Sequence, residues 1–192
     1  MDEEALIQSS KRGDLAAFNR LVEHYQGQVF NLALRMLRDA SAAEDITQET
    51  FLSAHRSLTS FKTGNFRAWL LRIAANGCRD YLRSARVRRS TSLEAMSETQ
   101  GMNLETDEES PEAYTLRHEL SGVIQAGLTR LPTDQRLALI LIDVQGLSYG
   151  EAAQAMGVPM GTVKSWLSRA RLGLRDYLLT QRELLPSTLR LG

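Results

Sequence analysis

Four arginines and one asparagine recur at steps of four, three, four and three residues, along a helix that we predict to begin near Asn65. Such steps bring side chains onto one face of an α-helix, so these five residues form a single stripe. A stripe of this charge would repel itself unless it faced a polyanion, and it therefore indicates contact with nucleic-acid phosphates. The stripe consists of Arg72, Asn76, Arg79, Arg83 and Arg86.

The segment in front of this stripe mixes aromatic and cationic side chains with a glycine. It reads Phe61-Lys-Thr-Gly-Asn-Phe-Arg-Ala-Trp69. Aromatic rings beside cations suit unstacked bases and a single-stranded backbone. The same rings could instead anchor a hydrophobic core, and we expect that role for Phe61. The loop as a whole predicts contact with single-stranded nucleic acid.

A second cationic face lies near the C-terminus, on a helix predicted from about Met160 to Leu179. At about 100° per residue, its apolar side chains fall on one side, which must pack, and its cations and hydroxyls fall on the other. Arginine can bind guanine bidentately in the major groove, while lysine and serine suit phosphates and base edges. A solvated basic face is the alternative for the charges alone. The outer side holds Lys164, Ser165, Ser168, Arg169, Arg171 and Arg175.

A helix-turn-helix is predicted to position this second face. Leu131-Pro132 marks a helix boundary, because the residue before proline avoids the helical region, and Thr133 could cap the next helix through about Val144. Ser148 and Glu151 form a capping box, and the segment 156–159, Met-Gly-Val-Pro, forms the turn. A helix, a tight glycine-containing turn and a second helix are typical of DNA binding, so we prefer DNA contact to solvation for the cationic face.

A capping-box pattern at Ser41 and Glu44 predicts another helix, running through Leu58. Its outer face carries acids and an amide around a leucine. A lone exposed leucine needs no explanation, but an apolar residue with a polar rim also resembles a protein interface whose partner is basic. The residues alone leave these alternatives open. The face holds Asp45, Gln48, Glu49 and Leu52.

The composition predicts an all-α protein of two small helical domains. Of 192 residues, 43% are hydrophobic and only 6% aromatic, with Ala, Leu, Arg, Glu and Gln dominant. The net charge is zero, but residues 94–119 hold 8 acidic groups and 1 basic group. We therefore expect a first domain over residues 1–90, a flexible acidic linker over 91–112 and a second domain over 113–192.

Several function classes are disfavoured. A single cysteine, Cys78, and three scattered histidines predict no disulfide, metal or cofactor site, and no glycine-rich phosphate loop is present. An acid pair such as Asp45 and Glu49 has no base or metal partner, so we expect no catalytic residues and no enzyme. The acidic N-terminus and the lack of a run of roughly 18 apolar residues predict a cytoplasmic protein.

Taken together, these segments resemble the sigma factors of the extracytoplasmic-function group, group 4 of the sigma-70 family. The resemblance covers about residues 10–90 and 113–180. The matching pieces are Asp45-Ile-Thr-Gln-Glu-Thr-Phe51, Phe66-Arg-Ala-Trp-Leu-Leu-Arg-Ile-Ala-Ala-Asn76, Leu131-Pro132, Leu147-Ser-Tyr149, Gly161-Thr-Val-Lys-Ser165 and Arg169-Ala-Arg171.

The resemblance implies a function for each face. The first domain would dock on the clamp helices of the largest polymerase subunit through the acidic face that contains Leu52. The second domain would contact the polymerase flap and read the −35 element. The neighbouring helix and loop would open and read the −10 element. The −10 residues would be Lys62, Asn65, Phe66, Arg72, Asn76, Arg79 and Arg83, and the −35 residues would be Thr162, Lys164, Ser165, Ser168, Arg169 and Arg171.

The resemblance also implies partners: core RNA polymerase, promoter DNA and a separate anti-sigma factor, with no small-molecule ligand. Trp166 departs from the family pattern, and its position on the inner side of the helix favours packing. The main alternative is a two-domain regulator that binds operator DNA through the helix-turn-helix. It would leave the first domain without a role.

Overall fold

The computed structural model describes residues 2–62, 64–91 and 111–181, and within these ranges every regular element is helical. The all-α prediction is confirmed. The first group of helices comprises α1 (Glu3–Lys11), α2 (Leu15–Leu37), α3 (Ala40–Ser57), a 3-10 turn (Leu58–Ser60) and α4 (Phe66–Thr91). The second comprises α5 (Pro111–Arg130), α6 (Thr133–Leu139), a π-helical turn (Ile140–Val144), α7 (Tyr149–Met156) and α8 (Met160–Thr180).

Side-chain caps fix the start of the helices that carry the first set of functional residues. The carboxylate of Asp39 accepts a hydrogen bond from the Ala42 backbone N–H at 3.0 Å, so α3 begins at Ala40. The cap predicted at Ser41 is therefore wrong by two residues, because aspartate caps as well as serine does and Asp39 comes earlier in the chain. Asn65 Oδ1 accepts from the Ala68 N–H at 2.9 Å, and α4 starts next to it as predicted.

The helix-turn-helix is present as α7, a turn and α8. Ser148 N–H donates to the Glu151 carboxylate at 2.7 Å, and the Glu151 N–H donates back to Ser148 Oγ at 3.3 Å, which confirms the capping box. Gly157 ends α7 with φ at 67°, a left-handed conformation that glycine adopts without strain. The cap expected at Thr133 is absent, because Pro132 occupies the cap position and makes no side-chain hydrogen bond.

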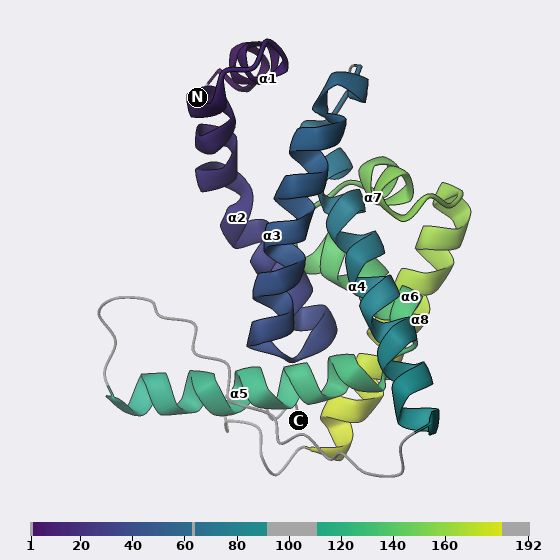
Figure 1. Cartoon of the computed structure of the whole chain (residues 1–192). Coiled ribbons are helices and arrows are strands. Elements are labelled where there is room, and N and C mark those ends of the chain that lie inside the picture. The colour runs from purple at the N-terminus through teal and green to yellow at the C-terminus, as the bar shows by residue number, and fades with distance from the viewer. Residues whose placement is uncertain (1, 63, 92–110, 182–192) are drawn as a thin grey trace.

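The two groups of helices pack directly on each other. In Figure 1, α4 runs beside α7, and the packing of α4 against α7 is extensive. One hydrophobic core continues from Phe66 and Ala74 of the first group to Leu141 and Met156 of the second. A smaller core lies between α5, α6 and α8. Residues 92–110 of the predicted linker lie outside the described residues, whereas Thr91 belongs to α4 and Pro111 begins α5.

Candidate nucleic-acid interface

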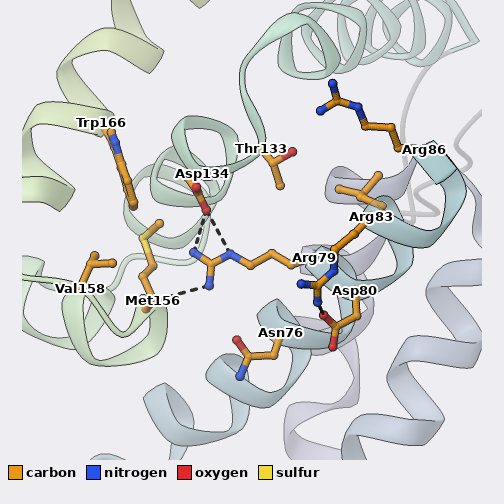
Figure 2. A pocket seen from close by; sticks show the side chains of 11 residues that line it. Asn76, Arg79, Asp80, Arg83, Arg86, Thr133, Asp134, Met156, Val158 and Trp166 are labelled. Atoms are coloured by element: carbon orange, nitrogen blue, oxygen red, sulfur yellow. Dashed lines mark hydrogen bonds and ion pairs between the residues drawn. The ribbon is translucent and has the colours of Figure 1, made fainter. Parts of the chain in front are cut away.

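The arginine stripe of α4 faces a cleft between the two groups of helices. The cleft has a volume of about 730 Å³ and is lined by α4 on one side and by α6, α7 and α8 on the other. Figure 2 shows Asn76, Arg79, Arg83 and Arg86 along its wall, with Trp166 opposite. Arg72, Asn76 and Arg83 are exposed, as expected for residues that bind a polyanion.

Arg79 differs from the rest of the stripe because it is already bound within the protein. Its Nε and Nη2 donate to Asp134 Oδ1 at 3.1 and 2.9 Å, and its Nη1 donates to the Met156 carbonyl at 3.4 Å (Figure 2). The Arg79 side chain is 24% exposed. Among the described residues, Arg83 pairs with Asp80, one turn earlier on the same helix, and it stays open to solvent. The cationic stripe is therefore partly used for contacts between the two groups of helices.

The aromatic loop splits into a buried and an exposed part. Phe66 lies 5.5 Å from both Phe61 and Trp69, measured between ring centroids, and is 1% exposed. The core role expected for Phe61 is confirmed, since it is 7% exposed. Phe66 is buried in the core as well, so it anchors the start of α4 and presents no surface to a base in this structure. Its assignment to DNA binding stays a prediction that requires the ring to leave the core.

Lys62 and Asn65 supply the exposed part of the loop. The Asn65 amide Nδ2 donates to the carboxylate of Glu151, across the boundary between the two groups of helices. The same glutamate forms the capping box of α7. The pKa of its carboxyl is lowered, and the largest cause is the hydrogen bond from the Ser148 backbone N–H. Asn65 thus performs two structural tasks at once: its oxygen caps α4, and its nitrogen binds α7.

The outer face of α8 is arranged as predicted. Val163, Leu167 and Ala170 are buried against the other helices. Thr162 is half-buried at the start of the helix. The remaining side chains assigned to the −35 element are exposed, and together they form a ridge of cations and hydroxyls on α8. They are Lys164, Ser165, Ser168, Arg169 and Arg171. A major groove is wide enough to admit an α-helix.

Two residues that the sequence did not single out, Asp143 and Tyr149, contact cations of this ridge. Arg171 Nε donates to Asp143 Oδ2 at 2.9 Å, and its Nη2 donates to Asp143 Oδ1 at 2.6 Å. This hydrogen bond is the main cause of a raised pKa for Arg171. Lys164 Nζ lies 5.5 Å from the ring centroid of Tyr149, within cation–π range. Asp143 precedes Arg171 by 28 residues, so no local pattern reveals the pair.

Trp166 lies on the side of α8 that faces the cleft. It is half-buried, packs on the shared core and lines the cleft opposite α4. The packing role favoured by its position on the inner side of α8 is therefore confirmed. Its neighbours include residues of the first group of helices, which helical periodicity alone could not show.

The acidic face of α3 borders an apolar groove. Asp45, Gln48, Glu49 and Leu52 are all exposed, Leu52 by 52%. The groove, of about 490 Å³, lies between α2 and α3 and includes Gln48 and Leu52. Leu15 is 62% exposed at its edge. An exposed apolar groove with an acidic rim fits a protein partner better than a solvated helix face.

Other kinds of site find no support in the part of the chain that the structure covers. Over those residues, no three His, Cys, Asp or Glu side chains are grouped to hold a metal ion. Cys78 is buried in the core, and desolvation raises the pKa of its thiol to about 12. Within the same described ranges, no helix is both long and apolar enough to cross a bilayer.

Two family models match the chain in separate segments. Sigma-70 region 2 matches residues 21–88, and Sigma-70, region 4 matches residues 121–174. The RNA polymerase sigma-H factor of Pseudomonas aeruginosa is 38% identical over 174 residues, which cover 88% of this chain and 90% of the relative. The ECF RNA polymerase sigma-E factor of Haemophilus influenzae is 36% identical over 177 residues, covering 89% and 92%.

Solved structures agree in fold. The sigma factor RpoE of Bartonella quintana, crystallised with the anti-sigma factor NepR, superposes with a TM-score of 0.70 at 28% identity, covering 84% of this chain and 96% of that chain. CnrH, in complex with the cytosolic domain of CnrY, gives 0.69 at 24% identity, covering 94% and 99%, which supports the fold alone. On the family models and these relatives, the chain belongs to the sigma-70 family and is an RNA polymerase sigma factor of the extracytoplasmic-function group.

Proposed function

We propose that each of the faces described above has its own role in sigma-factor function. The groove between α2 and α3, with its rim of Asp45, Gln48, Glu49 and Leu52, docks on the clamp helices of core polymerase. Residues 1–90 form the unit that binds core and melts the −10 element, 91–112 form the linker, and 113–192 form the unit that reads the −35 element and contacts the flap. The protein works in the cytoplasm and catalyses no reaction itself.

The observation that carries this proposal is the outer face of α8. Its exposed cations and hydroxyls project from a helix-turn-helix whose turn and cap are formed as DNA readers require. A charged ridge on an isolated helix could be merely solvated, whereas this ridge is held in orientation by Asp143 and Tyr149. The groove on α2 and α3 then accounts for the separate first unit, which an operator-binding regulator would leave without a role.

The exposed residues of the stripe and of the loop before it make the −10 contacts. Lys62, Arg72, Asn76 and Arg83 are open to solvent, and the three cations among them would follow the backbone of the melted strand. Arg79 and Asn65 join them only after leaving their present partners, Asp134 and Glu151. Phe66 would have to leave the core.

We further propose control by a separate anti-sigma factor. The RpoE relative is solved with NepR, which supports an inhibitor that binds this fold. An inhibitor of this kind could cover the apolar groove beside Leu52, since that groove is exposed in the free chain.

The test combines core binding with transcription. Purified chain is incubated with bacterial core polymerase, the complex is isolated, and run-off transcription is measured from a library of promoters. Stable binding and transcription from one −35/−10 motif would support the proposal. Tight binding to duplex DNA without core, and no binding to core, would instead favour an operator-binding regulator.

A further inference from the structure

Lys11, the last residue of α1, contacts the residue with which the aromatic loop begins. Its ammonium Nζ donates to the Phe61 carbonyl and lies 5.5 Å from the centroid of the Phe61 ring. The two residues are 50 positions apart in the sequence. Lys11 is half-buried and Phe61 is 7% exposed, so this charge-assisted hydrogen bond forms in partly desolvated surroundings, where it is stronger than at an open surface.

The opposite end of α1 reaches the same aromatic cluster. The Tyr25 hydroxyl donates to the carboxylate of Glu3, in the first turn of α1. The Tyr25 ring lies 5.7 Å from the ring of Phe66, and Phe66 lies 5.5 Å from Phe61, measured between centroids. The two ends of α1 are thereby joined to the two aromatic residues that flank the exposed residues of the loop.

α1 is itself held firmly enough to act as a fixed support. Ile7, in the middle of the helix, is 2% exposed and belongs to the main core. After α1 the chain turns through Gly13, whose φ of 95° is a left-handed conformation that glycine adopts without strain. Asp14 then caps α2 and accepts a hydrogen bond from Ser9 Oγ at 2.9 Å. A contact from this helix therefore restricts whatever it binds.

The exposed residues of the loop depend on this support for their position. Lys62 directly follows Phe61 in the chain, and Gly64 has a φ of 126°, where the backbone has no side chain to limit its conformations. A recognition site has to hold its side chains within about 0.5 Å of the binding geometry. The Lys11 contact supplies a fixed point at the start of a segment that is otherwise open to solvent.

We propose that Lys11 is a positioning residue for the −10 element: it fixes the Phe61 backbone, and through it the exposed residues of the aromatic loop, without itself touching DNA. The inference rests on the proposed function, because it adds a residue to the −10 reading assigned to the first unit. Loss of the contact lowers discrimination among −10 bases and leaves the −35 reader on α8 unaffected. A lysine that only stabilised the fold would lower total transcription and leave the base preferences of both elements unchanged.

The experiment uses the full-length chain with core polymerase and a barcoded promoter library randomised in both elements. Lys11→Met keeps the apolar stem and removes the donor and the charge, whereas Lys11→Arg keeps a cationic donor. The matched control is Arg12→Met, which removes the same charge at the adjacent, exposed position. Transcripts are sequenced for each chain, and the enrichment of each base is measured separately at the −10 and the −35 positions.

We expect Lys11→Met to lower base enrichment at the −10 positions about threefold to tenfold, the effect of losing one hydrogen bond, and to leave the −35 positions unchanged. Lys11→Arg should retain most of the −10 enrichment, and Arg12→Met should match wild type. Unchanged −10 enrichment in Lys11→Met would overturn the proposal, and so would an equal loss in Arg12→Met or an equal loss at both elements.

Hydrogen exchange of the free chain tests the contact without polymerase. The Phe61 N–H donates to the Leu58 carbonyl at 3.1 Å, and the Ala42 N–H donates to the Asp39 carboxylate at 3.0 Å at the start of α3. Lys11→Met should speed exchange at Phe61 and not at Ala42, and equal exchange at Phe61 in both chains refutes the positioning role.

The two measurements also separate this proposal from the function on which it rests. A wild-type chain that transcribes, with unchanged −10 enrichment in Lys11→Met, refutes the positioning role alone. A wild-type chain that neither binds core nor transcribes refutes the proposed function, and the positioning role with it.

Discussion

Arg171 on α8 is held by Asp143 through two hydrogen bonds of 2.9 and 2.6 Å, which join the recognition helix to the π-helical turn at the end of α6. This geometry fixes the plane of the guanidinium. Ordering a flexible arginine on binding costs about 0.5 to 1.5 kcal/mol, and Asp143 removes part of that cost in advance. Asp143 would then act on promoter recognition through Arg171, without itself touching DNA.

The first prediction concerns this pair. Asp143→Asn should lower transcription from a promoter with an intact −35 element about threefold to tenfold, the range expected for that ordering cost. Transcription from a promoter whose −35 element has been scrambled should not change. The free energy of unfolding should fall by less than about 1 kcal/mol, because the two side chains of the pair are still 53% and 32% exposed. An equal loss on both promoters would show that Asp143 supports the fold and not the reading.

The second prediction concerns strand opening. Arg83→Glu reverses an exposed cation of the stripe, which pairs with Asp80 among the residues that the structure describes. It should reduce promoter opening more than tenfold, measured by permanganate reactivity of unpaired thymines, since a repelled phosphate replaces an attracted one. Core binding should be unchanged.

Arg20→Glu provides the matched control for this substitution. It is the same charge reversal at an exposed position of α2, on the side away from the apolar groove. If both reversals reduce opening alike, net charge and not the stripe is responsible.

Local features of the fold were predictable from the sequence because they depend on near neighbours. The capping box of Ser148 and Glu151, the left-handed Gly157 and the outward face of α8 all follow from spacings of a few residues. The sequence also identified the acidic face of α3, whose four assigned residues are exposed.

Contacts between distant residues were not predictable in this way. Arg79 meets Asp134 across 55 residues, and helical periodicity shows which side chains share a face but not which faces meet. Phe66 illustrates a second limit. An aromatic ring beside cations has the same local pattern whether it stacks on a base or on Phe61, and only the packed structure shows the ring buried. Leu15 is a contrasting case, because its apolar side chain is exposed and borders an open groove.

The third prediction concerns docking on polymerase. Leu52 is 52% exposed at the centre of the acidic rim, so Leu52→Ala should leave the free energy of unfolding nearly unchanged. An apolar anchor buried in an interface is worth about 1 to 3 kcal/mol, which corresponds to a loss of core affinity between about fivefold and a hundredfold. Leu52→Met keeps the apolar volume and should restore most of the affinity, measured by fluorescence anisotropy with labelled chain. Unaltered affinity in Leu52→Ala would move the docking surface elsewhere.

The fourth prediction concerns the pH dependence of the capping box on α7. The pKa of Glu151 is lowered, mainly by the hydrogen bond from the Ser148 N–H, so the folded state favours the charged carboxylate. A depressed folded pKa stabilises the protein above the unfolded pKa of about 4.3, and the contribution disappears as pH falls through the folded value. Glu151→Ala should lower the free energy of unfolding by about 1 kcal/mol at pH 7.

The conservative variant separates charge from capping geometry. Glutamine can also close a capping box, so Glu151→Gln should retain much of the stability at pH 7 but lose the pH-dependent part. The difference between wild type and Glu151→Gln, measured by urea unfolding, should therefore be largest near neutral pH and should shrink as the pH falls below about 4.3. A difference that stays constant from pH 7 to pH 3 would mean that the carboxylate charge contributes nothing, and that the hydrogen bond to Ser148 and the contact with Asn65 act through geometry alone.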